Sequence, residues 1–248
     1  MVLLRPAESP SEPPRVLLLE RPNLAAFAPG TQVFPGGSVD PADRDPGWSR
    51  LLPSWSDRGR DPRAPLALRL AAVRETYEEA GVLLGRHRDG SRPTAEDIER
   101  LSSVRAQMRA GRADQFRVGL AAADLVPDVE ELIFCAHWIT PSGLPRRFDT
   151  RFFLTPWPLG QEPQPDPLGE HISLRWAAPS IALEEARQGR CQLLPPTRAV
   201  LEELATAHSV EDAMARAREA RVETIQPRLE DVTEERYPGL DVSRLHRE

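Results

Sequence analysis

The chain alternates between short apolar runs and longer segments of mixed polarity. The short runs lie between residues that favour turns, such as Pro, Gly and Asp, and this pattern predicts β-strands. The predicted strands are residues 2–4, 15–20, 31–34, 131–140, 147–155 and 171–178. The longer segments carry helix start signals or apolar residues at a spacing of 3.6 positions, which predicts helices. The predicted helices are residues 66–80, one or two within 94–123, and then 180–189, 195–207 and 209–223.

This mixture of strands and helices predicts an α/β or α+β sandwich. Residues 94–123 open on a capping-box pattern at Thr94 and Asp97. Residues 40–65 are rich in Pro, Asp, Gly and Arg, so we expect them to form a long surface loop. The apolar side chains of this loop should fold back onto the body of the protein, because exposed aromatic clusters of this density are unusual. These side chains are Trp48, Leu51, Leu52 and Trp55.

The helix predicted over residues 66–80 carries an unusual group of charges. Glu75, Glu78 and Glu79 are spaced i, i+3 and i+4, so their carboxylates crowd one side of the helix. Like charges at this spacing cost roughly 0.2–0.5 kcal/mol per pair in an isolated helix. Either a bound cation offsets this cost, or the three glutamates form a solvated acidic face.

Composition narrows the classes of partner. The 248 residues carry a net charge of −6, whereas a broad nucleic-acid interface needs a basic surface. No apolar run approaches the roughly 20 residues of a membrane span, and the first ten residues lack the long apolar core of a secretory signal. We therefore expect neither a nucleic-acid nor a membrane partner. All 32 basic residues are arginine, which codon bias in a GC-rich genome explains, so a single arginine is weak evidence of a phosphate site.

The two cysteines give an indication of the cellular compartment. Cys135 and Cys191 lie far apart and lack the spacing of a zinc or redox site. They predict reduced thiols in a cytoplasmic protein, with one disulfide between them as the open alternative. The final residues, "LHRE", do not match a peroxisomal address, which also favours the cytoplasm.

A glycine pair and the acidic helix together resemble a known motif. Gly36 and Gly37 end the segment "VFPGG", Asp43 follows, and "RETYEEAGV" begins at Arg74. This resembles the Nudix box, G-x5-E-x7-R-E-U-x-E-E-x-G-U with U apolar, a loop–helix–loop that binds divalent metals. Asp43 stands for the usual first glutamate, and Thr76 stands for an apolar residue. The larger departure is that 30 residues separate Asp43 from Arg74 where the box has 7, an insertion of 23.

The interrupted box resembles that of a Nudix subgroup that includes the mammalian peroxisomal coenzyme A diphosphatase. The likeness covers roughly residues 2–200 and includes "RRFDTRFFL" and "GEHISLRWAAPSIAL". It implies a Nudix α/β/α sandwich with a mixed sheet, formed as a single domain over residues 1–222. The expected domain contains a loop insertion at 44–65 and a helical insert at 94–123, and a polar tail follows at 223–248.

The resemblance implies a site for Mg²⁺ or Mn²⁺, which are hard cations that take oxygen ligands. The implied ligands are the carbonyl of Gly37 and the carboxylates of Glu75, Glu78 and Glu79. Arg74 would orient a glutamate by ion pairing. Glu170, which precedes the strand predicted over residues 171–178, would be an extra ligand or a general base. The implied catalytic residues are Glu75, Glu78, Glu79, Arg74 and Glu170.

Four arginines are candidates for binding the phosphates of a substrate, because guanidinium groups pair well with phosphate oxygens. They are Arg21, Arg146, Arg147 and Arg151. Pairing of Asp149 with Arg147 or Arg151 is the structural alternative, since alternate residues of a strand share one face.

The resemblance implies an enzyme that hydrolyses the pyrophosphate bond of a nucleotide-type small molecule. The preferred substrates are coenzyme A and acyl-coenzyme A, which would give adenosine 3′,5′-bisphosphate and a 4′-phosphopantetheine compound. ADP-ribose or a dinucleotide is the alternative substrate, and a nucleotide sensor without turnover is the non-enzymatic alternative. A homodimer is left open.

Overall fold

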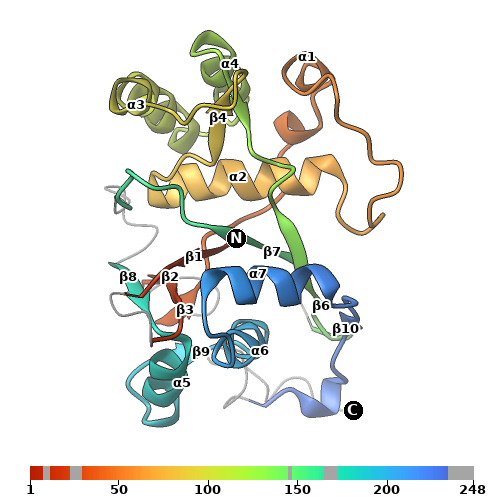
Figure 1. Cartoon of the computed structure of the whole chain (residues 1–248). Helices are drawn as coiled ribbons and strands as arrows, with labels where there is room; N and C mark the ends of the chain where they lie inside the picture. Colours follow the sequence, from red (N-terminus) through yellow and green to blue (C-terminus); the bar gives the residue numbers. More distant parts are fainter. Residues whose placement is uncertain (8–11, 23–29, 145–146, 165–172, 234–248) are drawn as a thin grey trace. The chain divides into compact units, whose positions relative to one another are not determined.

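The computed structural model describes residues 1–7, 12–22, 30–144, 147–164 and 173–233. These residues group into two compact units within the chain drawn in Figure 1. The first unit contains residues 1, 35–132 and 158–166, and the second contains residues 2–34, 133–157 and 167–248. The single domain expected over residues 1–222 stays a prediction.

The second unit is built around a mixed β-sheet of eight strands among the described residues. The strands run in the order β10-β6-β7-β1-β2-β3-β9, and β8 pairs with β2 beside this row (Figure 1). Their bounds are β1 (Val2–Arg5), β2 (Arg15–Glu20), β3 (Thr31–Val33), β6 (Ile133–Ile139), β7 (Asp149–Pro156), β8 (Ser173–Ala177), β9 (Gln192–Leu193) and β10 (Thr224–Ile225). Parallel pairs such as β1–β7 occur beside antiparallel pairs such as β1–β2, which confirms the predicted mixed sheet.

Three helices of the second unit supply apolar residues to the core beside this sheet. They are α5 (Pro179–Arg187), α6 (Pro195–Leu204) and α7 (Val210–Glu219), and a 3₁₀ turn, η2 (Leu229–Asp231), follows them. Val2 and Leu4 of β1 belong to the same buried cluster as Leu201 of α6 and Met214 of α7. The intervening Leu3 is fully buried as well, so β1 is apolar on both faces and its sequence does not alternate.

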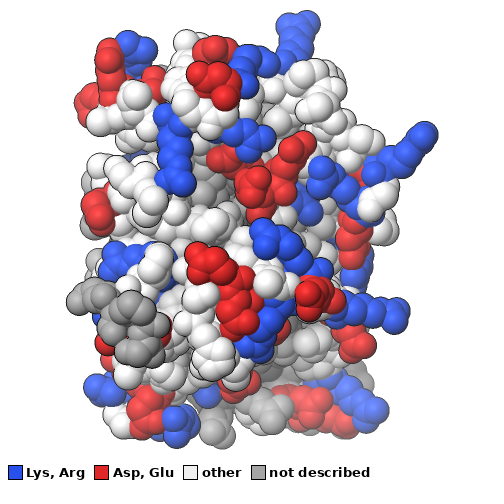
Figure 2. Space-filling view, viewed as in Figure 1, with Lys and Arg blue, Asp and Glu red and all other residues white. Residues whose placement is uncertain are grey.

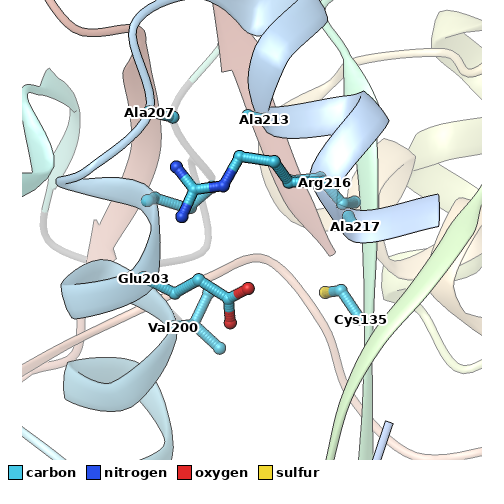
Figure 3. A pocket seen from close by; sticks show the side chains of 9 residues that line it. Cys135, Val200, Glu203, Ala207, Ala213, Arg216 and Ala217 are labelled. Atoms are coloured by element: carbon cyan, nitrogen blue, oxygen red, sulfur yellow. The ribbon is translucent and has the colours of Figure 1, made fainter. Parts of the chain in front are cut away.

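A small cavity lies among β6, β7, α6 and α7 in the second unit. Its volume is about 30 Å³, and Figure 3 shows Arg216 and Glu203 reaching into the space across from the thiol of Cys135. A ligand pocket for a drug-sized molecule typically measures roughly 300–1,000 Å³, whereas a water needs only about 10–15 Å³. The cavity therefore has room for a water molecule or two, and it is too small for a nucleotide.

The first unit is mostly helical. Its elements are η1 (Pro41–Arg44), α1 (Trp48–Leu51), α2 (Leu66–Ala80), β4 (Gly85–His87), α3 (Ala95–Arg109), α4 (Asp114–Ala122) and β5 (Leu125–Pro127). Helix α2 has the predicted bounds, with Pro65 before its first turn and Gly81 ending it at a left-handed φ of 69°. The predicted capping box opens α3, because Thr94 accepts from the N–H of Asp97 and Asp97 accepts from the N–H of Thr94.

The loop before α2 folds back onto the first unit, as expected. Trp48 and Leu51 are buried, and Trp48 Nε1 donates to the carbonyl of Ala42 at 2.9 Å. The ring centroid of Trp48 lies 6.2 Å from that of Phe116 in α4, and Phe116 in turn stacks on Tyr77 of α2 at 5.9 Å. The other two apolar side chains of the loop are half-buried. The loop and the α3–α4 segment are therefore joined through one aromatic cluster.

The elements that the sequence did not predict are short. They are η1, α1, β4, β5, β9, β10 and η2, each two to four residues long. Strand β10 lies in the segment expected to be a polar tail, where it pairs in parallel with β6. A segment of two to four residues is too short to show a periodicity in its sequence. Partners distant in the sequence decide whether such a segment forms a strand.

Figure 2 shows arginines interspersed with acidic side chains over the visible face. Among the described helices, each is too short or too polar to cross a bilayer.

Candidate metal centre

Arg74 of α2 is bound to the loop that precedes the insertion. Its Nε and Nη2 each donate to one carboxylate oxygen of Asp43 at 2.9 Å, and both side chains are almost fully buried. Nη2 also donates to the carbonyl of Ser38 at 2.8 Å. Burial opposes the charge of Arg74, but its hydrogen bonds to Asp43 and Glu75 outweigh burial and raise its pKa. The insertion therefore leaves the contact between the two ends of the interrupted motif intact.

Arg74 also contacts two of the three glutamates. Its Nη1 donates to Glu75 at 2.9 Å and lies 3.4 Å from an oxygen of Glu78. Attraction to the guanidinium offsets part of the repulsion between the two carboxylates. Arg74 is therefore placed to orient carboxylates.

Glu79 points toward the glycine pair. Its carboxylate accepts a hydrogen bond of 2.7 Å from the N–H of Gly36, and the residue is only 7% exposed. A solvated acidic face would leave this carboxylate in water, so that interpretation is wrong for Glu79. Its burial beside a backbone donor indicates a site with a defined geometry.

Gly37 allows the glycine loop to approach Glu75 closely. A Cβ atom added at Gly37 would lie 2.5 Å from the carboxylate carbon of Glu75. Any other residue would push the carboxylate away or shift the loop. The glycine therefore lets the backbone of the loop lie close to a predicted ligand where the loop meets the helix.

Burial makes the charge on Glu75 costly. Burial raises the pKa of Glu75 to about 7, Arg74 opposes this shift, and the neighbouring Glu78 adds to it. The single positive charge of Arg74 therefore does not fully offset the burial and the mutual repulsion of the carboxylates on α2. A further positive charge beside Glu75 would favour its ionised form.

The donor set fits a hard divalent cation. It consists of the carboxylate oxygens of Glu75, Glu78 and Glu79, with the backbone of Gly37 alongside, and Mg²⁺ and Mn²⁺ prefer oxygen ligands. Within the described part of the chain, no three carboxylate, imidazole or thiolate side chains converge as a finished metal cage. Two of the glutamates instead contact Arg74, and the third contacts Gly36. A bound metal would replace these partners or share the carboxylates with them.

The described members of the predicted phosphate-binding set, Arg21, Arg147 and Arg151, belong to the second unit. The backbone N–H of Arg21 donates to Thr31 at 3.0 Å, and Nε of Arg147 donates to the carbonyl of Thr140 at 3.2 Å. Arg151 forms an ion pair of 2.6 Å with Asp149, so the structural alternative for this pair is observed. Two other predicted site residues, Arg146 and Glu170, lie outside the described residues.

Some hydrogen-bonding groups at the candidate metal centre were not predicted from the sequence. The N–H of Gly36 and the carbonyl of Ser38 are backbone groups, so their residue types do not mark them as partners of Glu79 and Arg74. The resemblance identified Asp43 as a substitute for the usual glutamate, but only the structure shows its bidentate contact with Arg74.

A shallow groove of about 470 Å³ lies elsewhere in the first unit. It runs between residues 40–46 and the turn from α3 to α4, with Asp40, Arg44, Asp45 and Asp114 among its lining residues. Among the described residues, its lining does not include the three glutamates of α2. The groove is therefore distinct from the candidate metal centre.

Comparison with known proteins identifies relatives of this chain. A family model described as the NUDT19 Nudix domain matches residues 57–204. A Homo sapiens protein named acyl-coenzyme A diphosphatase NUDT19 is 34% identical over 250 residues, covering 83% of this chain and 66% of the human protein. A Caenorhabditis elegans protein named putative nudix hydrolase 7 is 33% identical over 185 residues, covering 73% of this chain and 52% of the worm protein. The chain thus spans less than two thirds of the length of these relatives.

A solved structure supports the same relationship. The crystal structure of a NUDIX hydrolase from Alicyclobacillus acidocaldarius matches with a TM-score of 0.70 and 27% identity. The match covers 86% of this chain and 92% of that chain. The predicted α/β fold of Nudix type is therefore confirmed.

Proposed function

This chain belongs to the Nudix family represented by the NUDT19 Nudix domain, and we propose that it hydrolyses the pyrophosphate bond of coenzyme A or acyl-coenzyme A. The products are adenosine 3′,5′-bisphosphate and 4′-phosphopantetheine or its acyl derivative. The name acyl-coenzyme A diphosphatase, carried by the human relative, supports this substrate class. Hydrolysis of an acid anhydride is the reaction class that a metal-dependent carboxylate site suits.

The observation that carries this proposal is the set of three glutamates on α2 beside the glycine pair. The N–H of Gly36 binds Glu79, and Gly37 lets the backbone approach Glu75. We propose that Mg²⁺ or Mn²⁺ is held by Glu75, Glu78, Glu79 and the carbonyl of Gly37. When bound, the cation neutralises charge on the pyrophosphate and on the leaving phosphate.

The protein side chains have separate roles in this proposal. Arg74 orients Glu75 and Glu78, while Asp43 and Ser38 hold Arg74 in place. Glu170, the fifth of the predicted catalytic residues, accepts a proton from the attacking water in this proposal. The buried position of Glu79 keeps its carboxylate ordered before substrate binds.

A release assay tests the proposed activity. Purified protein is incubated with coenzyme A and Mn²⁺ or Mg²⁺, and the adenosine products are separated by chromatography. Adenosine 3′,5′-bisphosphate should form only when metal is present. Faster cleavage of ADP-ribose or a dinucleotide would reassign the substrate, and specific binding without turnover of any of them would indicate a nucleotide sensor.

The 3′-phosphate of coenzyme A gives a sharper test of the substrate. We propose that Arg146, Arg147 or Arg151 contacts this phosphate, and that Arg21 binds another phosphate of the substrate. A charge-assisted hydrogen bond contributes about 1.5–3 kcal/mol, so kcat/KM for dephospho-coenzyme A should be roughly ten- to a hundred-fold lower. Arg147→Ala and Arg151→Ala are compared, and the variant that loses the contact should erase this difference. Equal kcat/KM values for both substrates in the unmodified protein would exclude such a contact.

We propose a reducing, cytoplasmic setting for the activity. Cys135 and Cys191 are both free thiols in the structure, which supports a reducing compartment. Localisation of the tagged protein tests the compartment, and sedimentation analysis decides whether it forms the homodimer left open by the sequence.

A further inference from the structure

The last turn of α2 is held by a side chain from the α3–α4 segment. The final carbonyls of an α-helix lack partners within the helix and need other donors. Arg105 of α3 donates its Nε to the carbonyl of Glu78 at 3.0 Å and its Nη2 to the carbonyl of Glu79 at 3.1 Å. These two acceptors belong to two of the predicted metal ligands. Arg105 is only 7% exposed, so its contacts are shielded from water.

Other groups complete this arrangement. Arg109, one helical turn after Arg105, donates to the carbonyl of Glu78 at 3.2 Å. The N–H of Gln164 donates to the carbonyl of Ala80 at 2.8 Å, and Arg105 donates to the carbonyl of Gln164 at 3.0 Å. The carbonyls of residues 77–80 thus all accept hydrogen bonds, the first from the N–H of Gly81.

Gly81 makes room for Arg105. A Cβ atom at this position would lie 2.6 Å from Nη1 of Arg105. The left-handed φ of 69° at Gly81 also favours glycine. The glycine near the end of the Nudix box therefore both ends α2 and admits the guanidinium to the carbonyls.

These contacts affect the predicted metal ligands Glu78 and Glu79 through the backbone of the last turn. The Cα–Cβ bond of each helical residue has a direction fixed by the backbone around it, so the last turn aims the side chains of Glu78 and Glu79. A cation at the C-terminus of a helix is also favoured by the helix dipole, which stabilises this turn. Both hydrogen bonds from Arg105 to this turn end on backbone oxygens, so they leave the carboxylate oxygens to other partners.

We propose that Arg105 is a positioning residue of the metal centre, which aligns Glu78 and Glu79 by binding their backbone carbonyls. This inference rests on the proposed function of α2 as the metal-binding helix. It also gives the α3–α4 segment a role, because the segment supplies the arginine that binds the end of that helix. Residues that orient metal ligands typically change metal affinity or activity by roughly 10–100-fold when replaced.

The test compares Arg105→Gln with Arg100→Gln. Arg100 lies on the same helix, but its side chain is 63% exposed and pairs with Glu96, so its replacement removes an arginine without touching α2. Mn²⁺ binding is measured by calorimetry on the full chain without substrate. The dissociation constant should rise about ten-fold or more for Arg105→Gln and stay unchanged for Arg100→Gln.

Activity and rescue separate positioning from a general loss of folding. For Arg105→Gln, the Mn²⁺ concentration that gives half-maximal hydrolysis should rise about as much as the dissociation constant, while KM for coenzyme A at saturating metal changes little. Arg105→Lys should recover part of the affinity, because one ammonium replaces a guanidinium that reaches two carbonyls. If Arg105→Gln does not fold, Arg105→Met, which keeps an apolar stem and has no hydrogen-bond donor, is measured in the same way, and wild-type Mn²⁺ affinity in it would overturn the inference.

Failure of this inference is distinguishable from failure of the proposed function. Wild-type Mn²⁺ affinity in folded Arg105→Gln would overturn the positioning role even if coenzyme A is hydrolysed normally. Weak Mn²⁺ binding in that variant supports the positioning role even if the unmodified protein leaves coenzyme A intact, since the calorimetry needs no turnover. Loss of activity to the same fraction at every Mn²⁺ concentration, with unchanged affinity, would also contradict the inference.

Discussion

At the scale of single residues, the candidate site is a balance between three carboxylates and one guanidinium. Arg74 contacts Glu75 and Glu78 and is itself held by Asp43, while Glu79 accepts from the N–H of Gly36. Each carboxylate therefore has a partner that a metal ion would have to replace or share. Single substitutions at these positions separate the electrostatic role of a side chain from its role in folding.

Glu79→Gln should abolish most activity while the protein stays folded. Glutamine keeps an oxygen that can accept from Gly36, so the loop contact survives, but the ligand charge is lost. The kcat value should fall by about a hundred-fold or more, and relief of repulsion in the helix should offset part of any lost stability by a few tenths of a kcal/mol. Initial rates at saturating Mn²⁺ and circular dichroism check both effects. Full activity in this variant would remove Glu79 from the site.

The raised pKa of Glu75 predicts how stability changes with pH. Its folded pKa of about 7 lies above the ordinary value of 4.5, so the folded protein binds more protons than the unfolded chain between these values. The contribution of Glu75 to the free energy of unfolding should therefore fall as pH rises from 4.5 to 7, by up to about 3 kcal/mol.

Urea unfolding of metal-free protein at pH 5 and pH 7.5 measures this change. Glu75→Gln serves as the comparison, because its side chain does not ionise. The variant should lose less stability over this range than the unmodified protein, and Mn²⁺ affinity of the unmodified protein should rise with pH as the proton leaves. An identical pH dependence in both proteins would contradict the raised pKa.

At the scale of elements, helix α2 is supported near its C-terminal end by segments that the standard Nudix box lacks. The aromatic cluster of Trp48, Phe116 and Tyr77 joins the inserted loop and α4 to the last turn of α2. Arg105 of α3 contacts the end of the same helix. The two insertions expected from the sequence thus act on the helix that carries the candidate ligands.

Trp48→Ala should destabilise the protein strongly. Trp48 is 3% exposed and donates to Ala42, so truncation leaves a cavity and removes this hydrogen bond. The expected loss is about 3–5 kcal/mol, or roughly 10 °C in Tm. Trp55→Ala is the matched control, because this tryptophan of the same loop is half-buried and bonds to the exposed Asp57. Thermal scans with similar losses for both variants would show that the loop does not depend on the buried tryptophan.

At the scale of the whole molecule, the chain combines a mixed sheet in one unit with the candidate metal centre in the other. All the contacts described around Glu75, Glu78 and Glu79 lie within residues 35–132 of the first unit. Binding of a metal to the folded protein alone must therefore stabilise this unit directly.

Mn²⁺ should raise the Tm of the full chain. A ligand present at 100 times its dissociation constant stabilises the folded state by about 2.7 kcal/mol, which corresponds to roughly 5–10 °C for a chain of this size. If the scan shows separate transitions, only the one in which α2 unfolds should move. Calorimetric scans with Mn²⁺ and with a chelator provide the measurement, and Glu79→Gln should shift much less. No shift in the unmodified protein would contradict a metal centre on α2.

The sequence by itself determined the chemistry and the local structure of the site. The spacing of Glu75, Glu78 and Glu79 predicted one crowded helix face, and the proline and glycine at its ends predicted the bounds of α2 that the structure shows. Helix period, caps and long apolar strands depend on neighbours in the chain, so they can be read from a single sequence. The motif resemblance likewise identified the Nudix family before any contact was known.

Only the tertiary structure decided how these parts are held. It brought Asp43 to Arg74 across the insertion, buried Glu79 against the N–H of Gly36, and placed Arg105 on the carbonyls of α2. The shortest strands were decided in the same way, through partners distant in the sequence. These contacts join residues far apart in the chain, and many of them end on backbone groups that every residue carries. Residue type and spacing therefore contain no signal for them, because the partner is selected by the three-dimensional path of the chain.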